Sequence, residues 1–158
     1  MSVDDTMAVR AFHKKFRFAT DRNLVNDVHA GVTVALDRAA AEMARLAKIM
    51  LQKAEFAESR SDWRMTRAHL MTEELSETIK ALADNDEVAL LDGLADLEYV
   101  TQGTAVTYDL PLGQAFGVVH ASNMSKDVSD GREIHPVKGD MYIEPDLAQV
   151  LKWHRSHR

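Results

Sequence analysis

Residues 71–80 read MTEELSETIK and place three acidic side chains, Glu73, Glu74 and Glu77, on one turn of a predicted helix. Side chains three or four residues apart lie side by side on a helix, so Glu77 is a neighbour of both other acids. Like charges at these spacings cost about 0.2–0.5 kcal/mol per pair, and only Lys80 offsets them locally. Such a cluster either faces water or binds a cation.

The helical period decides which of these acids faces inward. The main apolar face of the helix is formed by Met71, Leu75, Ile79 and Leu82. Glu74 and Glu77 lie beside a second, smaller apolar strip of Leu70 and Ala81, whereas Glu73 points toward the more polar side. The inner pair is therefore predicted to be Glu74 and Glu77, with Glu73 in solvent or behind them.

The following segment, EVALLDGLADLEYVTQGTAV at 87–106, is apolar on almost every face and predicts a helix that is buried on several sides. Asp92 and Asp96 nevertheless project from it four residues apart, and no lysine or arginine occurs between Ala81 and Thr107. Burying a carboxylate is costly unless it is paired, protonated or bound to a metal. This second acidic pair therefore also needs a partner from elsewhere.

A turn at 84–86, DND, joins the two predicted helices. Antiparallel helices joined by a tight turn bring together residues equally far from that turn. Glu74 is then opposite Asp96, and Glu77 is opposite Asp92, so four carboxylates line one seam. An oxygen-only set of this kind suits Mg²⁺ or Mn²⁺. The alternative is that all the acids face solvent, as surface carboxylates usually do, but two acidic pairs on consecutive helices favour the cation site.

Composition narrows the class of protein. The chain has 158 residues, which predicts a single domain over 1–158, and its net charge is -6, which disfavours a nucleic-acid binder. It contains no cysteine, so disulfides, thiolate metal sites and cysteine nucleophiles are excluded. No apolar run approaches the roughly 18 residues of a membrane span, and the first ten residues lack the apolar core of a signal peptide. We therefore expect a cytoplasmic enzyme or binding module without a membrane partner.

The rest of the chain also reads as helices, which predicts an all-α bundle. Helices are expected over about 4–16, 32–58, 63–83, 86–108, 112–122 and 146–154. The segment 127–158 holds several glycines and prolines and is expected to be irregular up to its last helix, with at most one short hairpin. The catalytic helices are expected within about 63–126.

These motifs resemble those of a known family. EELSE (73–77), the run from Asp92 to Lys126 ending in SNMSK (122–126), and VKGDMYIEPDL (137–147) resemble the all-α nucleoside triphosphate pyrophosphohydrolases. This superfamily includes MazG and phosphoribosyl-ATP pyrophosphohydrolase, and the sequence is most similar to the MazG-like branch of bacteria and phages. The similarity covers Arg67 to Leu147 and the stretch VRAFHKKF (9–16). The motifs are short, but their order and spacing are specific in combination.

The resemblance implies an Mg²⁺-dependent hydrolase that converts a nucleoside triphosphate, (d)NTP, into (d)NMP and pyrophosphate, with Mn²⁺ as a substitute metal. It implies a helical bundle of the all-α NTP pyrophosphatase type and assigns the roles as follows. The metal ligands would be Glu74, Glu77, Asp92 and Asp96; Glu74, Glu77 and Lys126 would be catalytic; and Asn123, Lys126 and Lys138 would bind substrate. Glu73 or Glu77 would accept the proton of the attacking water.

The sequence departs from the family pattern at position 93. The superfamily commonly reads ExxE followed by ExxD, but Gly93 stands three residues before Asp96, so Asp92 is the available acid. A second departure is the long alanine-rich helix expected at 32–58, which looks inserted and is expected to support a homo-oligomer, a dimer or tetramer.

The function has alternatives. Some phage relatives of this kind remove dGTP, and on that resemblance alone we expect a purine preference (dGTP or GTP) and a bacterial or phage-infected cytoplasm. One rival is phosphoribosyl-ATP pyrophosphohydrolase, which the tail motif SNMSK…KG…PDL disfavours. The other is a non-catalytic helical scaffold that binds a protein partner, which could dispense with the acids.

Overall fold

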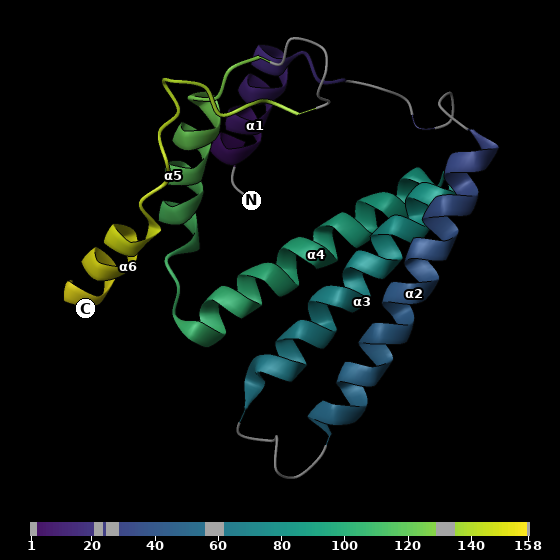
Figure 1. Cartoon of the computed structure of the whole chain (residues 1–158). Coiled ribbons are helices and arrows are strands. Elements are labelled where there is room, and N and C mark those ends of the chain that lie inside the picture. The colour runs from purple at the N-terminus through teal and green to yellow at the C-terminus, as the bar shows by residue number, and fades with distance from the viewer. Residues whose placement is uncertain (1–2, 21–23, 25–28, 56–61, 129–134, 158) are drawn as a thin grey trace. The chain divides into compact units, whose positions relative to one another are not determined.

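A computed structural model describes residues 3–20, 24, 29–55, 62–128 and 135–157. Its helices are α1 (Val3–Phe16), α2 (Ala30–Ala54), α3 (Trp63–Asp84), α4 (Glu87–Tyr108), α5 (Leu112–Met124) and α6 (Leu147–Ser156). The described residues form no strand beyond one isolated bridge, between Asp127 and Val137. The predicted all-α fold is confirmed, and each helix expected from the sequence is present (Figure 1).

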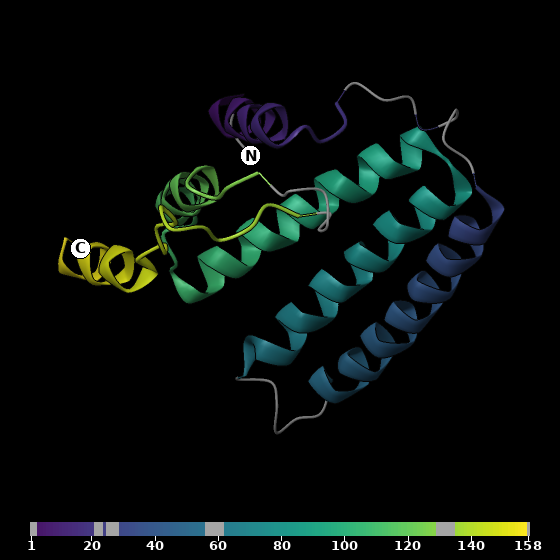
Figure 2. The ribbon, with the colours of Figure 1, turned by 45° about the horizontal axis from the view of Figure 1, so that its top comes forward.

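Packing divides the chain into two compact units: a central unit (Asn23–Tyr108) and a terminal unit (Met1–Arg22 with Asp109–Arg158). The prediction of a single domain over 1–158 stays a prediction. In the central unit α3 lies between α2 and α4 and packs against both, as Figures 1 and 2 show. Among the described residues no helix is long and apolar enough to cross a membrane.

Local signals fix the ends of α3 and the start of α4. Asp62 caps α3, because its Oδ1 accepts a hydrogen bond from the backbone N–H of Arg64 at 3.0 Å. The helix ends where Asn85 adopts the left-handed conformation, with φ 59° and ψ 37°. Asp86 Oδ1 then accepts from the backbone N–H groups of Val88 and Ala89, both at 3.0 Å, and starts α4. The predicted DND turn is therefore tight.

Small side chains make the contacts between these helices, which differs from the prediction for α3. Met71, placed on its main apolar face, is 37% exposed. The buried residues of α3 are His69, Ser76, Thr78, Ala81 and Ala83. Two of them bond to backbone carbonyls of α2: Ser76 Oγ donates to Ala40 O at 2.9 Å, and His69 Nδ1 lies 3.1 Å from Ala47 O. Small residues, rather than large apolar ones, form these contacts because they let the helix backbones approach closely.

In the terminal unit α5 packs against both α1 and α6. Phe16 at the end of α1 is buried and packs against Phe12 with ring centroids 4.6 Å apart and the ring planes tilted by 51°. Lys15 Nζ donates to the backbone oxygens of Met124 and Lys126 and so binds the C-terminal end of α5. The expected tail hairpin falls partly on residues 129–134, which lie outside the described residues; the Asp127–Val137 bridge is its described part.

Candidate active site

The four predicted metal ligands lie on the two helices that meet across the DND turn. Glu74 and Glu77 belong to α3, and Asp92 and Asp96 belong to α4. Two glycine contacts define the register of the two helices. Gly93 lies against Thr78, and Gly103 lies against the Arg67 side chain, and the members of each pair are about equally far from the turn.

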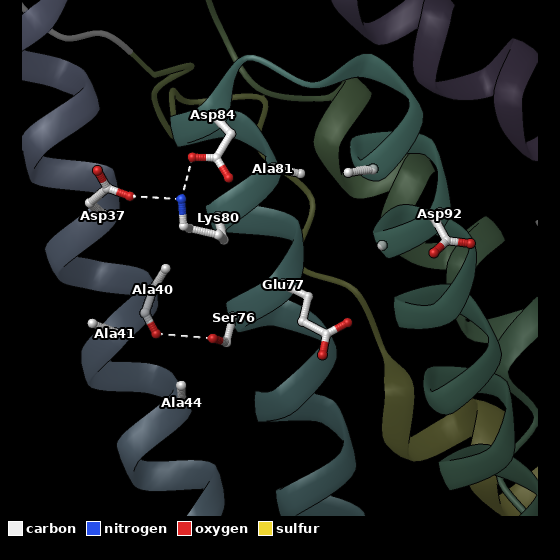
Figure 3. Close-up of a pocket in the computed structure, with 12 residues that line it drawn as sticks. Asp37, Ala40, Ala41, Ala44, Ser76, Glu77, Lys80, Ala81, Asp84 and Asp92 are labelled. Carbon is white, nitrogen blue, oxygen red and sulfur yellow. Dashed lines mark hydrogen bonds and ion pairs between the residues drawn. The ribbon is translucent and has the colours of Figure 1, made fainter.

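The same register places each predicted pair of acids at one level, as the turn argument predicted. Glu74 is level with Asp96, because this pair falls between the two glycine contacts, and Glu77 is level with Asp92, because each directly precedes one member of the Thr78–Gly93 contact. Figure 3 shows the Glu77 carboxylate extending from α3 toward the side of α4. The acids of consecutive helices therefore share one seam.

Gly93 explains why the acid stands at position 92. A Cβ atom at Gly93 would lie 2.8 Å from Thr78 Oγ1 and 3.1 Å from Thr78 Cα. Position 93 faces the backbone of α3, where no side chain fits, so a carboxylate cannot be accommodated there in this packing. Asp92, the preceding residue, is exposed and borders the same space as Glu77. The departure from the family's ExxD spacing is thus a consequence of close helix packing.

The charges on the seam act on one another. Partial burial raises the pKa of Glu74, and the negative charges of Glu77, Asp96, Glu73 and Asp92 raise this pKa further. Glu74 is half-buried, whereas Glu77, Asp92 and Asp96 are exposed. The seam is therefore open to solvent on one side, and its negative charge is concentrated enough to disfavour ionisation of its most enclosed member.

The donor set fits a hard divalent cation, since all four side chains offer carboxylate oxygens from two facing helices. Nevertheless, in the part of the chain that the structure describes, no three His, Asp or Glu side chains are grouped closely enough to hold an ion. Mutual repulsion separates carboxylates that lack a shared cation. Holding an ion would therefore require these side chains to rotate toward one another.

Glu73 and Glu77, the two candidates for the proton acceptor, occupy different surroundings. Glu73 Oε2 lies 3.4 Å from Nε2 of His69, which is buried against α2. Glu77 has an exposed side chain that extends toward α4. The geometry favours Glu77 over Glu73 for contact with a ligand on the seam.

Two cations lie near the acids: Lys80, which the sequence analysis named as their local counter-charge, and Arg67, to which it gave no role. Lys80 Nζ bonds to Asp84 Oδ1 and lies 3.3 Å from Asp37 Oδ1 of α2 (Figure 3). Arg67 lies two helical turns before Glu74, and its Nε is buried without a hydrogen-bond partner among the described residues. The sequence spacing could have indicated the position of Arg67. Arg67 lies seven residues before Glu74, and Gly103 lies seven residues after Asp96, so antiparallel pairing of Glu74 with Asp96 also places Arg67 beside Gly103.

A groove of about 510 Å³ crosses the face of α3 between α2 and α4, and we call it the α2–α4 groove. Its lining includes Asp37, Ala40, Ala41 and Ala44 from α2, Glu77, Lys80 and Asp84 from α3, and Ala89, Asp92 and Gly93 from α4. Figure 3 shows the alanines of α2 facing the side chains of α3. Two of the predicted metal ligands therefore border a concave site of ligand size.

The predicted substrate-binding residues Asn123, Lys126 and Lys138 lie in the terminal unit, apart in sequence from the four acids. The structure brings their two segments together. Asp127 and Val137 exchange backbone hydrogen bonds of 2.9 and 3.1 Å, and the N–H of Ile143 donates to Ser125 Oγ at 2.8 Å. SNMSK and VKGDMYIEPDL are therefore neighbours in the fold.

Lys138 and the glycine that follows it are held by local contacts. Lys138 Nζ lies 4.6 Å above the centroid of the Tyr142 ring. Gly139 packs against the Asp127 carboxylate so closely that a side chain at 139 would clash with it. The contact between the two segments therefore leaves room at position 139 for a side chain only if the Asp127 carboxylate moves.

The fold is all-α, as it is in the all-α pyrophosphohydrolases. The sequence profile described as phosphoribosyl-ATP pyrophosphohydrolase matches residues 43–123, about half of the chain, and the chain belongs to this family. The protein is accordingly a hydrolase that acts on phosphoric anhydride bonds. No curated protein and no solved structure matches the chain.

The match also bears on the long helix α2. The match starts at residue 43, inside α2, and runs to Asn123 in α5. The second half of α2 therefore lies within the region that the family profile matches. The expectation that the helix is an addition that supports oligomerisation stays a prediction. Only its first half, which carries Asp37 and the alanines Ala40 and Ala41, extends beyond the matched region.

Proposed function

We propose that this protein hydrolyses a nucleoside triphosphate to the monophosphate and pyrophosphate with the help of Mg²⁺, for which Mn²⁺ can substitute. The observation that carries the proposal is the shared seam of α3 and α4. Four acids stand there in two facing pairs, and partial burial together with the negative charges of the other acids raises the pKa of Glu74. This concentration of negative charge and carboxylate oxygens is what a divalent cation requires.

Glu74, Glu77, Asp92 and Asp96 would hold the metal. When bound, Mg²⁺ supplies charge neutralisation for the triphosphate and acidifies a coordinated water. Hydrolysis consumes one water and breaks the bond between the α- and β-phosphates. Glu77 would accept the proton of that water, because Glu73 is already close to His69. Phosphoryl transfer depends mainly on positioning and charge stabilisation, so no further covalent chemistry is needed.

The terminal unit would supply phosphate-binding groups. Lys126 would hold phosphate oxygens and take part in catalysis by stabilising their charge, and Lys138 would contact the same phosphates. Asn123 would hold a sugar or phosphate group. Support comes from the neighbouring positions of SNMSK and VKG, which gather these side chains in one part of the fold.

The test is a screen for released pyrophosphate with the eight common NTPs and dNTPs and with phosphoribosyl-ATP, each with Mg²⁺, with Mn²⁺ and with EDTA. We expect metal-dependent release from at least one nucleoside triphosphate. Glu74→Ala and Asp96→Ala should each lose about a hundredfold or more in kcat/KM, which corresponds to several kcal/mol of transition-state stabilisation. Wild-type activity in both variants would show that Glu74 and Asp96 do not form the active site.

A second candidate is phosphoribosyl-ATP pyrophosphohydrolase activity, which the description of the matching family favours. It uses the same seam and releases pyrophosphate in the same way, so only the substrate separates the two. A catalytic efficiency for phosphoribosyl-ATP at least tenfold above that for every NTP would establish this candidate instead. A non-catalytic scaffold predicts no release from any of them.

Within the main proposal, a preference for purines (dGTP or GTP) rests on the resemblance to relatives that remove dGTP. The same screen tests this preference directly. We further propose a cytoplasmic homo-oligomer, a dimer or tetramer, that has no nucleic-acid or membrane partner.

A further inference from the structure

The α2–α4 groove combines two kinds of wall. On the α2 side Ala40, Ala41 and Ala44 recur at helical spacing and present methyl groups without long side chains. Ala81 and Gly93 add small residues from α3 and α4. A wall of small apolar groups leaves a flat-sided space, which suits the face of an aromatic ring. At about 510 Å³ the groove is within the size range of nucleotide and cofactor sites.

One end of the groove is polar and has a defined hydrogen-bonding pattern. Lys80 lies between Asp37 and Asp84 and bonds to one oxygen of each carboxylate. Each carboxylate has a second oxygen, and the ammonium group has a third N–H, beyond those used in these two contacts, and the three side chains carry a net charge of about -1 at neutral pH. This end therefore favours a neutral group that offers N–H donors.

The polar end and two of the acids of the seam line the same groove, one helical turn apart along α3. Glu77 stands one helical turn before Lys80, and Glu77 and Asp92 line the same groove as the Asp37–Lys80–Asp84 trio. A turn of helix rises about 5.4 Å. A molecule with its phosphates at the acids therefore has its nucleoside directed along α3 toward Lys80, and its terminal phosphate in the opposite direction, toward Arg67.

We propose that the α2–α4 groove binds the nucleoside of the substrate, with the base against the alanines of α2 and its hydrogen-bonding edge at Asp37, Lys80 and Asp84. This rests on the proposed function, which puts the phosphates at the acids. Enzymes that enclose a base commonly read its edge by hydrogen bonds and hold its faces between apolar groups. Guanine is the best complement, since its adjacent ring and amino N–H groups suit a carboxylate and its O6 suits the ammonium group.

Binding can be tested without turnover. ¹⁵N-labelled protein is titrated with GMP in the presence of Mg²⁺, and amide chemical shifts are followed by NMR. We expect shifts at Ala40, Ala41 and Lys80 that saturate with one dissociation constant, and weaker binding of UMP. Saturable GMP binding that leaves these amides unmoved overturns the groove as the nucleoside site.

Filling the groove tests the same idea through catalysis. Ala41→Phe places a ring in the groove, whereas Ala35→Phe adds the same ring at an exposed position of α2 outside it. We expect Ala41→Phe to raise KM for the best NTP about tenfold or more with a smaller change in kcat, because lost nucleoside binding acts on ground state and transition state alike. Ala35→Phe should keep the wild-type KM. Equal KM values in the two variants contradict the proposal.

The polar end is tested by isosteric variants. Asp37→Asn and Asp84→Asn keep the size of each side chain but replace an acceptor-only group with an amide that also donates. Discrimination between GTP and UTP in kcat/KM should fall about tenfold or more, as expected when a hydrogen-bonded edge is mismatched. An unchanged ranking of bases in both variants would show that this trio does not read the base.

These outcomes separate the two proposals. If the wild type releases pyrophosphate but the groove variants behave like Ala35→Phe, the nucleoside site is wrong and the proposed function stands. If no substrate yields pyrophosphate, the proposed function is wrong. The GMP titration still decides the groove in that case, because it measures binding to α2 and α3 without turnover.

Discussion

Glu74 shows how the packing of α3 and α4 acts on a single functional group. The residue is half-buried, and both its burial and the charges of the neighbouring acids raise its pKa. The two effects have the same sign, so the ionised form that a metal needs is held at a cost in free energy. Repulsion among the acids lowers the stability of the metal-free protein, and the same negative charge raises the affinity of the site for cations.

The first prediction concerns Glu74→Gln in metal-free buffer. Neutralising this side chain removes repulsion with neighbours on its own helix and on α4, so we expect Tm to rise by about 1–2 °C. Activity should fall about a hundredfold or more, since an oxygen of the proposed metal site is lost. Thermal unfolding and pyrophosphate release measure the two effects. Glu55→Gln, at an exposed position at the end of α2, should change neither.

The second prediction concerns pH. The pKa of Glu74 in the folded protein lies above its ordinary value of 4.5, so the folded state binds this proton more tightly than the unfolded chain does. Its contribution to the free energy of unfolding is therefore fully present below about pH 4.5 and is lost as pH rises through the folded pKa. Without metal, the Tm advantage of Glu74→Gln over wild type should grow between pH 4.5 and pH 7.5. An advantage that shrinks with rising pH would contradict this sign.

At the residue scale the sequence indicated which charged side chains are neighbours on one helix, but not which residues of other helices they contact. Like-charge spacing identified Glu74, Glu77, Asp92 and Asp96 as a set, because helical neighbours follow from sequence separation alone. The contact of Glu73 with His69 follows the same rule, because the two residues are four apart on α3. The contact of Lys80 with Asp37 was not predictable in this way, since it depends on the packing of α2 on α3.

At the scale of elements, the close approach of α3 and α4 depends on Gly93. The glycine lets the helix backbones meet next to Asp92, and Ala81 and Thr78 fill the space on either side. Sequence periodicity predicted that larger side chains would form this contact. It could not show that small residues would do so, because periodicity locates an apolar face but not the distance between two helices.

The third prediction concerns Gly93→Ala. Alanine raises helix propensity by about 1 kcal/mol, but its Cβ would meet Thr78 at 2.8 Å and force the helices apart. Overpacking of this kind costs about 1–3 kcal/mol, so we expect a net loss of about 1 kcal/mol, or about 2–4 °C in Tm. Activity should fall about tenfold because Asp92 moves relative to Glu77.

The control is Gly117→Ala in α5, where a Cβ would meet no atom within 4 Å. This change should stabilise the protein by about 0.4–1 kcal/mol and leave activity unaltered. Urea unfolding of both variants gives the comparison. Equal stabilisation by the two substitutions would mean that α3 and α4 do not approach as closely as the structure shows.

At the scale of the whole molecule, α4 carries an apolar stripe that its neighbours within the central unit leave uncovered. Val88, Leu91, Tyr99 and Val106 follow one side of the helix and are 80%, 72%, 79% and 79% exposed. Apolar surface of this size on a single helix is typical of an interaction surface. Its position beside Asp92 and Asp96 supports the proposal that the active form is a homo-oligomer.

The fourth prediction is that light scattering after gel filtration gives a mass at least twice the 17.7 kDa of one chain. Leu91→Lys places a charge in the middle of the stripe and should shift the mass toward the monomer, since interfaces of this kind exclude unpaired charge. Met7→Lys, at a similarly exposed apolar position of α1, should keep the oligomer. A wild-type protein that remains monomeric at high concentration would contradict the proposal.

Much of the overall architecture could be predicted from the sequence, because helix caps and periodicity are local signals. Asp62, the DND turn and Pro111 mark helix ends where the structure has them. The division into a central and a terminal unit was not predictable, since it depends on which helices pack together. For the same reason the sequence alone could name Asn123, Lys126 and Lys138 but not bring their segments together.

The most direct test of the account is whether the seam between α3 and α4 binds a divalent cation. Mn²⁺ is titrated into the protein with an α,β-methylene nucleoside triphosphate that cannot be cleaved, and free Mn²⁺ is measured by electron paramagnetic resonance. The ternary mixture should remove Mn²⁺ from solution, Mg²⁺ should release it, and the double variant Glu74→Gln/Asp96→Asn should bind no more than nucleotide alone does. Undiminished Mn²⁺ binding by the double variant would contradict the central claim.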